Sequence, residues 1–129
     1  MMDTASDIDT TPDSQPGGQP IDMSHLARYT GGEYTLNAEI LRLFDGQVNA
    51  MVGDLHTVLA QRDARRWKEI AHTIKGAARG VGAFRMGEAA AAAEPVDLVM
   101  HTDKAEAAIA RLMAEGDAVQ AFIAEYLAA

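Results

Sequence analysis

The sequence predicts an all-α fold, an antiparallel up-down four-helix bundle with a short extra helix on its N-terminal side. Three observations predict it. From Asp22 onward apolar residues recur at spacings of three and four, no segment alternates as a strand would, and only short loops separate the periodic segments. The 129 residues suit one domain and suffice to bury a core. We therefore expect a single helical domain over residues 22–129.

The first two expected helices are a short one and a long one. The stretch DMSHLARYT predicts a short helix that Gly31 and Gly32 end. Residues 34–61 follow with one apolar stripe, which is typical of a long amphipathic helix. The expected inward positions of this long helix are Leu36, Ile40, Leu43, Phe44, Val48, Met51, Val52, Leu55 and Leu59.

The next helix begins after Asp63, which is placed to cap its N-terminus. Gly80 and Gly82 suit its C-terminus, where the left-handed conformation favours glycine. We expect Trp67 to anchor the core from this helix. All its expected inward positions are Trp67, Ile70, Ala71, Ile74, Ala78 and Val81.

Two more helices complete the expected bundle. One covers about residues 85–100, and Pro95 should bend it or mark its effective end, because proline cannot donate the helical hydrogen bond. Asp103, with Glu106 three residues later, resembles a capping box for the last helix. The expected inward positions are Met86, Ala89, Ala90, Ala93 and Val96 in the first of the two, and Ile109, Leu112, Met113, Val119, Phe122, Ile123 and Tyr126 in the second.

Composition and charge narrow the possible functions. Residues 1–21 are rich in Asp, Thr, Ser, Pro and Gly, so we interpret them as a flexible acidic tail. The net charge of −8 disfavours non-specific binding to nucleic acid or to an anionic membrane. The chain has no cysteine, which excludes disulfides and thiolate metal sites. With neither a signal peptide nor a membrane-spanning apolar run, it is expected to be cytoplasmic.

Positive charge gathers in one segment of this acidic chain. Residues 62–85 hold seven arginines and lysines against two acidic residues, a net charge of +5. Residues three and four apart on a helix share a face, so Lys75 and Gly76 should lie with His72 opposite the apolar stripe. We therefore expect His72 to face solvent among several cations.

A solvent-facing imidazole among cations suits phosphoryl transfer. A neutral imidazole is a good nucleophile near pH 7, since the ordinary pKa of the group is about 6.5. Its attack on a phosphoryl group gives phosphohistidine. Lys75, one turn from His72, would pair with the phosphoryl oxygens. Gly76 costs the helix about 1 kcal/mol relative to alanine, and its missing side chain would let a partner's active site approach the ring.

The stretch HTIKGAARGVG resembles the motif of the histidine-containing phosphotransfer (HPt) domain family, roughly His-x-Leu-Lys-Gly-x5-Gly. His72, Lys75, Gly76 and Gly82 occupy the positions of that motif, and Ile74 replaces the usual leucine. The family is a four-helix bundle with a short extra helix and its histidine on the second long helix, so the resemblance extends beyond the motif to about residues 22–127.

The resemblance implies a phosphorelay intermediate. His72 would accept a phosphoryl group at Nε2 from a receiver-domain aspartate and pass it to another response-regulator receiver. The implied partners are response-regulator receiver domains and a hybrid histidine kinase. No cofactor is implied for this chain, because Mg²⁺ belongs to the partner receiver. The chain lacks the usual nucleotide-binding patterns, so we predict no autonomous kinase activity, and we expect a monomer.

Partner docking is expected on apolar surface beside His72 with charges around it. Ordinary core packing is the default explanation of each apolar residue, because sequence alone cannot distinguish core from interface. The candidates for partner binding are Met23, Leu26 and Tyr29 in the short first helix, and Lys68 and Arg79 on the charged face.

Two other interpretations stay open. Glu69 and His72 form Glu-x-x-His, the spacing that di-iron bundles use, although such sites need a second pair and inward-facing ligands, which the other three histidines do not provide. We accordingly expect no metal. A non-phosphorylated helical adaptor with an idle histidine is the second alternative. Glu69 either hydrogen-bonds the imidazole ring or pairs with Arg65 or Arg66.

Overall fold

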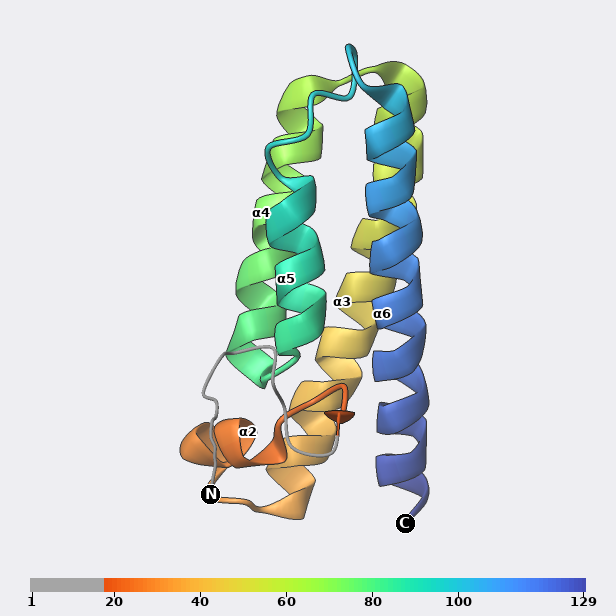
Figure 1. Cartoon of the computed structure of the whole chain (residues 1–129). Helices are drawn as coiled ribbons and strands as arrows, with labels where there is room; N and C mark the ends of the chain where they lie inside the picture. Colours follow the sequence, from red (N-terminus) through yellow and green to blue (C-terminus); the bar gives the residue numbers. More distant parts are fainter. Residues whose placement is uncertain (1–17) are drawn as a thin grey trace, which may run out of the picture.

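The computed structural model describes residues 18–129, and within them it is all-helical, as predicted (Figure 1). The predicted tail therefore lies outside the described residues up to position 17. None of the described helices is long and apolar enough to cross a membrane. The helices of this part of the chain are α2 (Met23–Thr30), α3 (Tyr34–Gln61), α4 (Ala64–Val81), α5 (Phe84–Ala93) and α6 (Thr102–Ala128).

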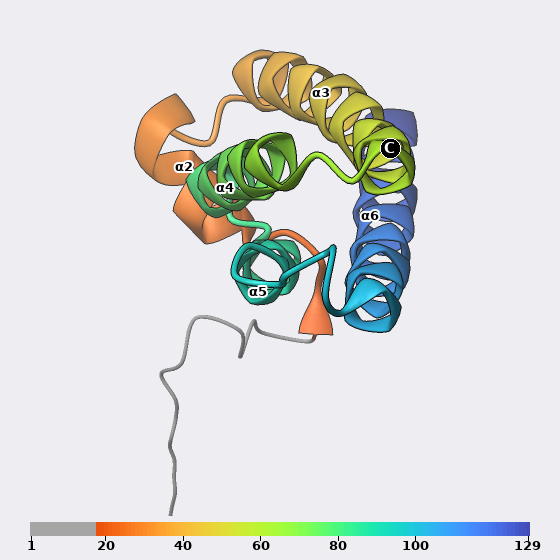
Figure 2. The same ribbon diagram turned by 90° about the horizontal axis from the view of Figure 1, so that it is seen from above.

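Helices α3 to α6 form an up-down bundle, and α2 lies across one end of it (Figure 1). Each long helix packs on its neighbours in the ring, α3 on α4, α4 on α5, α5 on α6 and α6 on α3. Seen along the bundle axis, α2 lies outside the ring beside α3 and α4 (Figure 2). The predicted four-helix bundle with a short extra helix is confirmed.

Helix α4 follows the sequence prediction closely. The Asp63 side chain caps its N-terminus by accepting a hydrogen bond from the Arg66 backbone N–H at 3.1 Å. At the other end Gly82, with φ of +91°, takes the left-handed conformation that ends the helix. Gly80 lies inside the helix instead. All the predicted inward positions are buried, namely Trp67, Ile70, Ala71, Ile74, Ala78 and Val81.

The N-terminal side of the bundle is tied to the end of α4. The backbone N–H of Asp22 donates to the carbonyl of Gly82 at 2.9 Å. Ile21, which we predicted to belong to the tail, is fully buried in the core instead. Leu26, a predicted docking residue, is also buried, with 1% of its surface exposed. Ile21 and Leu26 are buried because α2 and the residues just before it cover apolar surface at the end of the bundle, and the hydrophobic effect favours this burial.

Helix α3 shows where the predicted apolar stripe was wrong. Leu36 and Leu43 were expected to face inward, yet they are 41% and 67% exposed. Leu41 and Val58 are buried in their place. The helix carries apolar residues around more than one face, so the spacing rule alone selects the wrong stripe near its N-terminus.

Helix α5 is shorter than predicted. It ends at Ala93, two residues before Pro95, and a loop rather than helix leads to residue 101. The buried indole N–H of Trp67 donates to the carbonyl of Ala93 at 2.9 Å, which satisfies an acceptor at the helix end. The predicted capping box before α6 is also wrong: Asp103 lies within the first turn, and His101 precedes the helix without a side-chain cap.

Candidate functional site

His72 lies on the outer face of α4, as the helical spacing predicted. Its side chain is 67% exposed, while Ala71 and Ile74 on the opposite face are fully buried. The amphipathic pattern of α4 positions the imidazole, because burying the apolar stripe leaves the remaining face to solvent. The ring is therefore accessible to a reacting partner.

The carboxylate of Glu94 joins His72 to Lys75. Its Oε2 atom lies 3.2 Å from Nδ1 of the imidazole, and its Oε1 atom accepts a hydrogen bond from the Lys75 ammonium at 2.9 Å. An ionised carboxylate only accepts hydrogen bonds, so Nδ1 carries the proton in this contact. In neutral His72 the lone pair then belongs to Nε2, which makes Nε2 the nucleophilic atom.

The hydrogen bond from Lys75 has the largest effect on the pKa of Glu94. The hydrogen bond from the Lys75 ammonium, with smaller contributions from its charge and from His72, lowers the pKa of Glu94 below the ordinary value of 4.5, and partial desolvation opposes this only in part. Glu94 is therefore a carboxylate at neutral pH, in the form that both contacts require.

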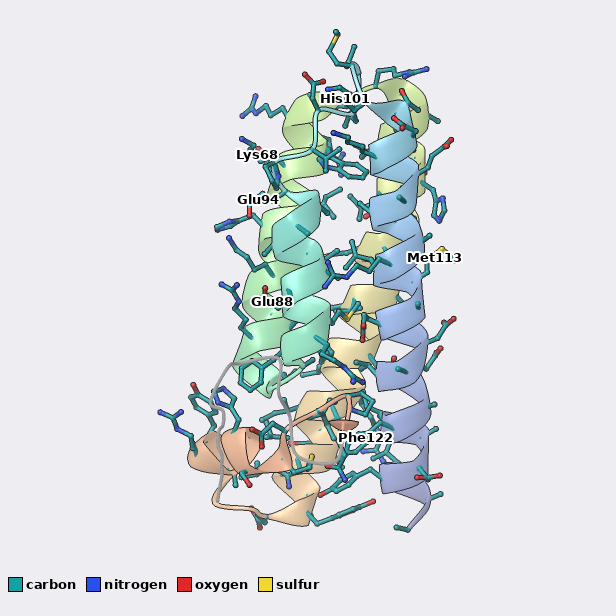
Figure 3. The ribbon with its side chains drawn as sticks, in the orientation of Figure 1. Lys68, Glu88, Glu94, His101, Met113 and Phe122 are labelled. Carbon is teal, nitrogen blue, oxygen red and sulfur yellow. The ribbon has the colours of Figure 1, made fainter. Side chains whose placement is uncertain are left out.

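Core packing places Glu94 at this position. It is the residue directly after α5, whose last carbonyl, that of Ala93, is held by the buried Trp67 of α4. The same interhelical hydrogen bond therefore fixes the backbone from which the Glu94 side chain reaches the face of His72. Figure 3 shows Glu94 at the α4–α5 edge of the bundle, with Lys68 near it.

Open space surrounds Gly76, one turn after His72. A Cβ atom added there would meet no other atom within 4 Å, apart from the helix's own backbone. The glycine is therefore not required by packing against another helix. Because Gly76 has no side chain, nothing at this position projects from the helix surface beside the imidazole and Lys75.

A shallow groove of about 440 Å³ runs beside the imidazole toward the N-terminus of α4. Glu69, whose role was open, lies in it and pairs with Arg65 at 3.4 Å; among the described contacts it makes none with the ring. The ring contact that we considered for Glu69 belongs to Glu94. The groove is lined by Arg65, Lys68, Glu69, His72, Thr73 and Glu94.

Of the predicted docking residues, Lys68 lines the groove with His72, and the other four lie elsewhere. Arg79 lies further along α4, where it pairs with Glu88 of α5 at 3.5 Å. Helix α2 meets α4 near Gly82, ten residues and about 15 Å from His72 at 1.5 Å per residue. In α2, Tyr29 is 66% exposed, Met23 is partly buried and, as noted above, Leu26 is in the core.

Sequence reasoning missed Glu94. It is 22 residues from His72, and only the antiparallel packing of α4 on α5 brings the two together. One signal was present: a single acid stands between an alanine-rich helix and Pro95, at the level where α5 should end. Among residues 18–129, no three His, Cys, Asp or Glu side chains gather in a way that would hold a metal ion.

A comparison with known protein families matched most of the bundle. The family model of the Hpt domain matches residues 39–128, from within α3 to the end of α6. The chain belongs to the Hpt domain family. This Hpt domain gave no match among the curated proteins or the solved structures. The family match confirms the resemblance that the HTIKGAARGVG stretch indicated.

Hpt domains carry out histidine phosphotransfer in the phosphorelays of two-component signalling. In those relays they interact with response-regulator receiver domains and with histidine kinases. For this Hpt domain the structure adds a solvent-exposed histidine whose Nδ1 is occupied by a carboxylate, beside a lysine and an unobstructed glycine.

Proposed function

We propose that His72 is the phosphoacceptor of this Hpt domain and that it acts as a cytoplasmic monomer. Nε2 attacks the phosphorus of an aspartyl phosphate on a receiver domain; the N–P bond forms, the P–O bond to the aspartate breaks, and the aspartate leaves as a carboxylate. The reverse step on a second receiver regenerates the imidazole. The contact between Nδ1 and Glu94 supports this assignment most directly, because it leaves Nε2 as the free nucleophile on an exposed face.

Lys75 and Gly76 take supporting roles in this proposal. The Lys75 ammonium is close enough to the imidazole to share Glu94 with it, and it would pair with phosphoryl oxygens on Nε2. Gly76 provides clearance for the receiver. The chain supplies the nucleophile, and Mg²⁺ is expected in the receiver alone, so we propose no kinase activity for the domain itself.

The test is transfer from a receiver domain that carries radiolabelled phosphoryl aspartate. The wild-type protein should acquire a label that is labile in acid and stable in alkali, the behaviour of a phosphoramidate bond, and His72→Gln should acquire none. Label on His72→Gln at the wild-type level would overturn the assignment of His72. Absence of label on the wild type with every receiver tested would favour the adaptor alternative.

A further inference from the structure

The groove beside His72 contains a lysine whose side chain has no polar partner among the residues that the structure describes. Lys68 is exposed, and its ammonium group makes no ion pair or hydrogen bond with any other residue among positions 18–129. Its neighbour in the groove, Arg65, is paired with Glu69 at 3.4 Å. Among the described residues, Lys68 is therefore a cation of this groove that forms no ion pair.

Lys75, in contrast, is already occupied. Its ammonium donates to Glu94 at 2.9 Å, and only 24% of its side chain is exposed. A phosphoryl group adds a charge of about −1.5 to −2 at neutral pH. The ammonium of Lys75 keeps two further N–H donors for this group, but the carboxylate of Glu94 already offsets its charge.

Helix geometry directs the imidazole toward Lys68. Every Cα–Cβ bond of a helix tilts toward the N-terminus, so the side chain of His72 covers the preceding turn. Lys68 lies in that turn, four residues before His72 and on the same face, and both side chains line the groove. Lys75 lies three residues after His72, in the following turn.

We propose that Lys68 is a second phosphoryl-pairing residue, which meets the phosphoryl group on Nε2 while Glu94 still holds Lys75. This inference rests on the proposed function of His72. Lys68 contributes charge and hydrogen-bond donors to the phosphoryl oxygens; it gains and loses no proton in the step. The transfer itself remains the exchange of a P–O bond for an N–P bond.

Phosphoramidate is the probe that isolates this role, because it is a small phosphoryl donor that needs no docking surface. Attack by Nε2 breaks its N–P bond and releases ammonia. We expect Lys68→Ala to slow the labelling of His72 by roughly two- to fivefold, the size expected for an exposed ion pair, with both phosphoramidate and a phosphorylated receiver as donor. Lys68→Arg should recover most of the rate.

Lys104→Ala is the matched control, since it removes the same charge from an exposed position on α6 outside the groove. Equal rates for Lys68→Ala and Lys104→Ala with both donors would overturn the role of Lys68 and leave that of His72 intact. Slowing with the receiver alone would also overturn it, because Lys68 would then contact the partner rather than the phosphoryl group. Loss of label from the wild type with both donors would instead remove the proposed function itself.

Discussion

Glu94 accepts a hydrogen bond from Lys75 at 2.9 Å through one carboxylate oxygen, and its second oxygen lies 3.2 Å from the imidazole of His72. His72 and Lys75 are thus coupled through one residue that follows another helix. A change at Glu94 affects the orientation of the ring and the availability of the lysine at the same time.

Replacing this carboxylate should reduce the reactivity of the ring. In Glu94→Ala, Nδ1 loses its acceptor, and a lost hydrogen bond of about 1 kcal/mol corresponds to a roughly fivefold slower phosphorylation of His72. Nitrogen NMR should show a smaller fraction of the tautomer that carries its proton on Nδ1. Rates and spectra of the wild type and the variant are to be recorded at the same pH.

Glu88→Ala serves as the control for this measurement. It removes the same charge from α5, where Glu88 pairs with Arg79 rather than with His72. We expect its labelling rate and its tautomer ratio to match those of the wild type. An unchanged tautomer ratio in Glu94→Ala would contradict the positioning role of Glu94.

The pH dependence of stability should also report on Glu94. Because the pKa of Glu94 is lowered in the folded protein, its contribution to stability is fully present above the ordinary value of 4.5 and is lost as the pH falls through the lowered pKa. The difference in free energy of unfolding between wild type and Glu94→Gln should therefore be constant from pH 7 to pH 5 and shrink toward pH 3. Urea unfolding at these pH values measures it; a difference that grows in acid would be the opposite result.

Gly76→Leu should separate stability from transfer. A Cβ atom at this position meets no other atom within 4 Å apart from the helix's own backbone, so the helix should gain about 0.5–1 kcal/mol from its better propensity. Transfer from a receiver should fall on the order of tenfold or more, because the approaching active site is displaced. Labelling by phosphoramidate, which needs no docking, should stay near the wild-type rate. Full transfer from the receiver would show that the glycine does not serve as clearance.

Gly82→Ala should destabilise the protein through a different mechanism. Gly82 has a φ of +91°, and a Cβ there would lie 2.7 Å from the carbonyl oxygen of Asp22. Strain and displacement of the α2 entry should together cost roughly 1–3 kcal/mol or more. Gly80→Ala, inside the helix and in open space, should instead stabilise by roughly 0.5–1 kcal/mol. Thermal unfolding of the pair checks both signs.

The helices could be predicted where their apolar residues form one unambiguous stripe. In α4 every predicted inward residue is buried, because charged residues separate the stripe clearly from the exposed face. In α3 the sequence around Leu41 and Leu43 is apolar on adjacent faces, and the choice between them depends on how α4 and α6 pack against it. No spacing rule includes that information.

In the candidate site, too, some residues could be predicted from the sequence and one could not. His72, Lys75 and Gly76 lie within two turns of one helix, so their common face follows from helical spacing alone. Glu94 comes from another helix, and its place depends on where α5 stops, which the sequence suggested only through Pro95. Local geometry was predictable, and the contact made by tertiary packing was not.

The hydrogen bond between Trp67 and the last carbonyl of α5 links the interior to the surface chemistry. A substitution of this tryptophan that left the bundle folded would shift the carboxylate next to it and so weaken the imidazole as a nucleophile. If His72 is the phosphoacceptor, such a variant would transfer phosphoryl groups more slowly, although the altered residue lies in the buried core, away from the reacting atoms.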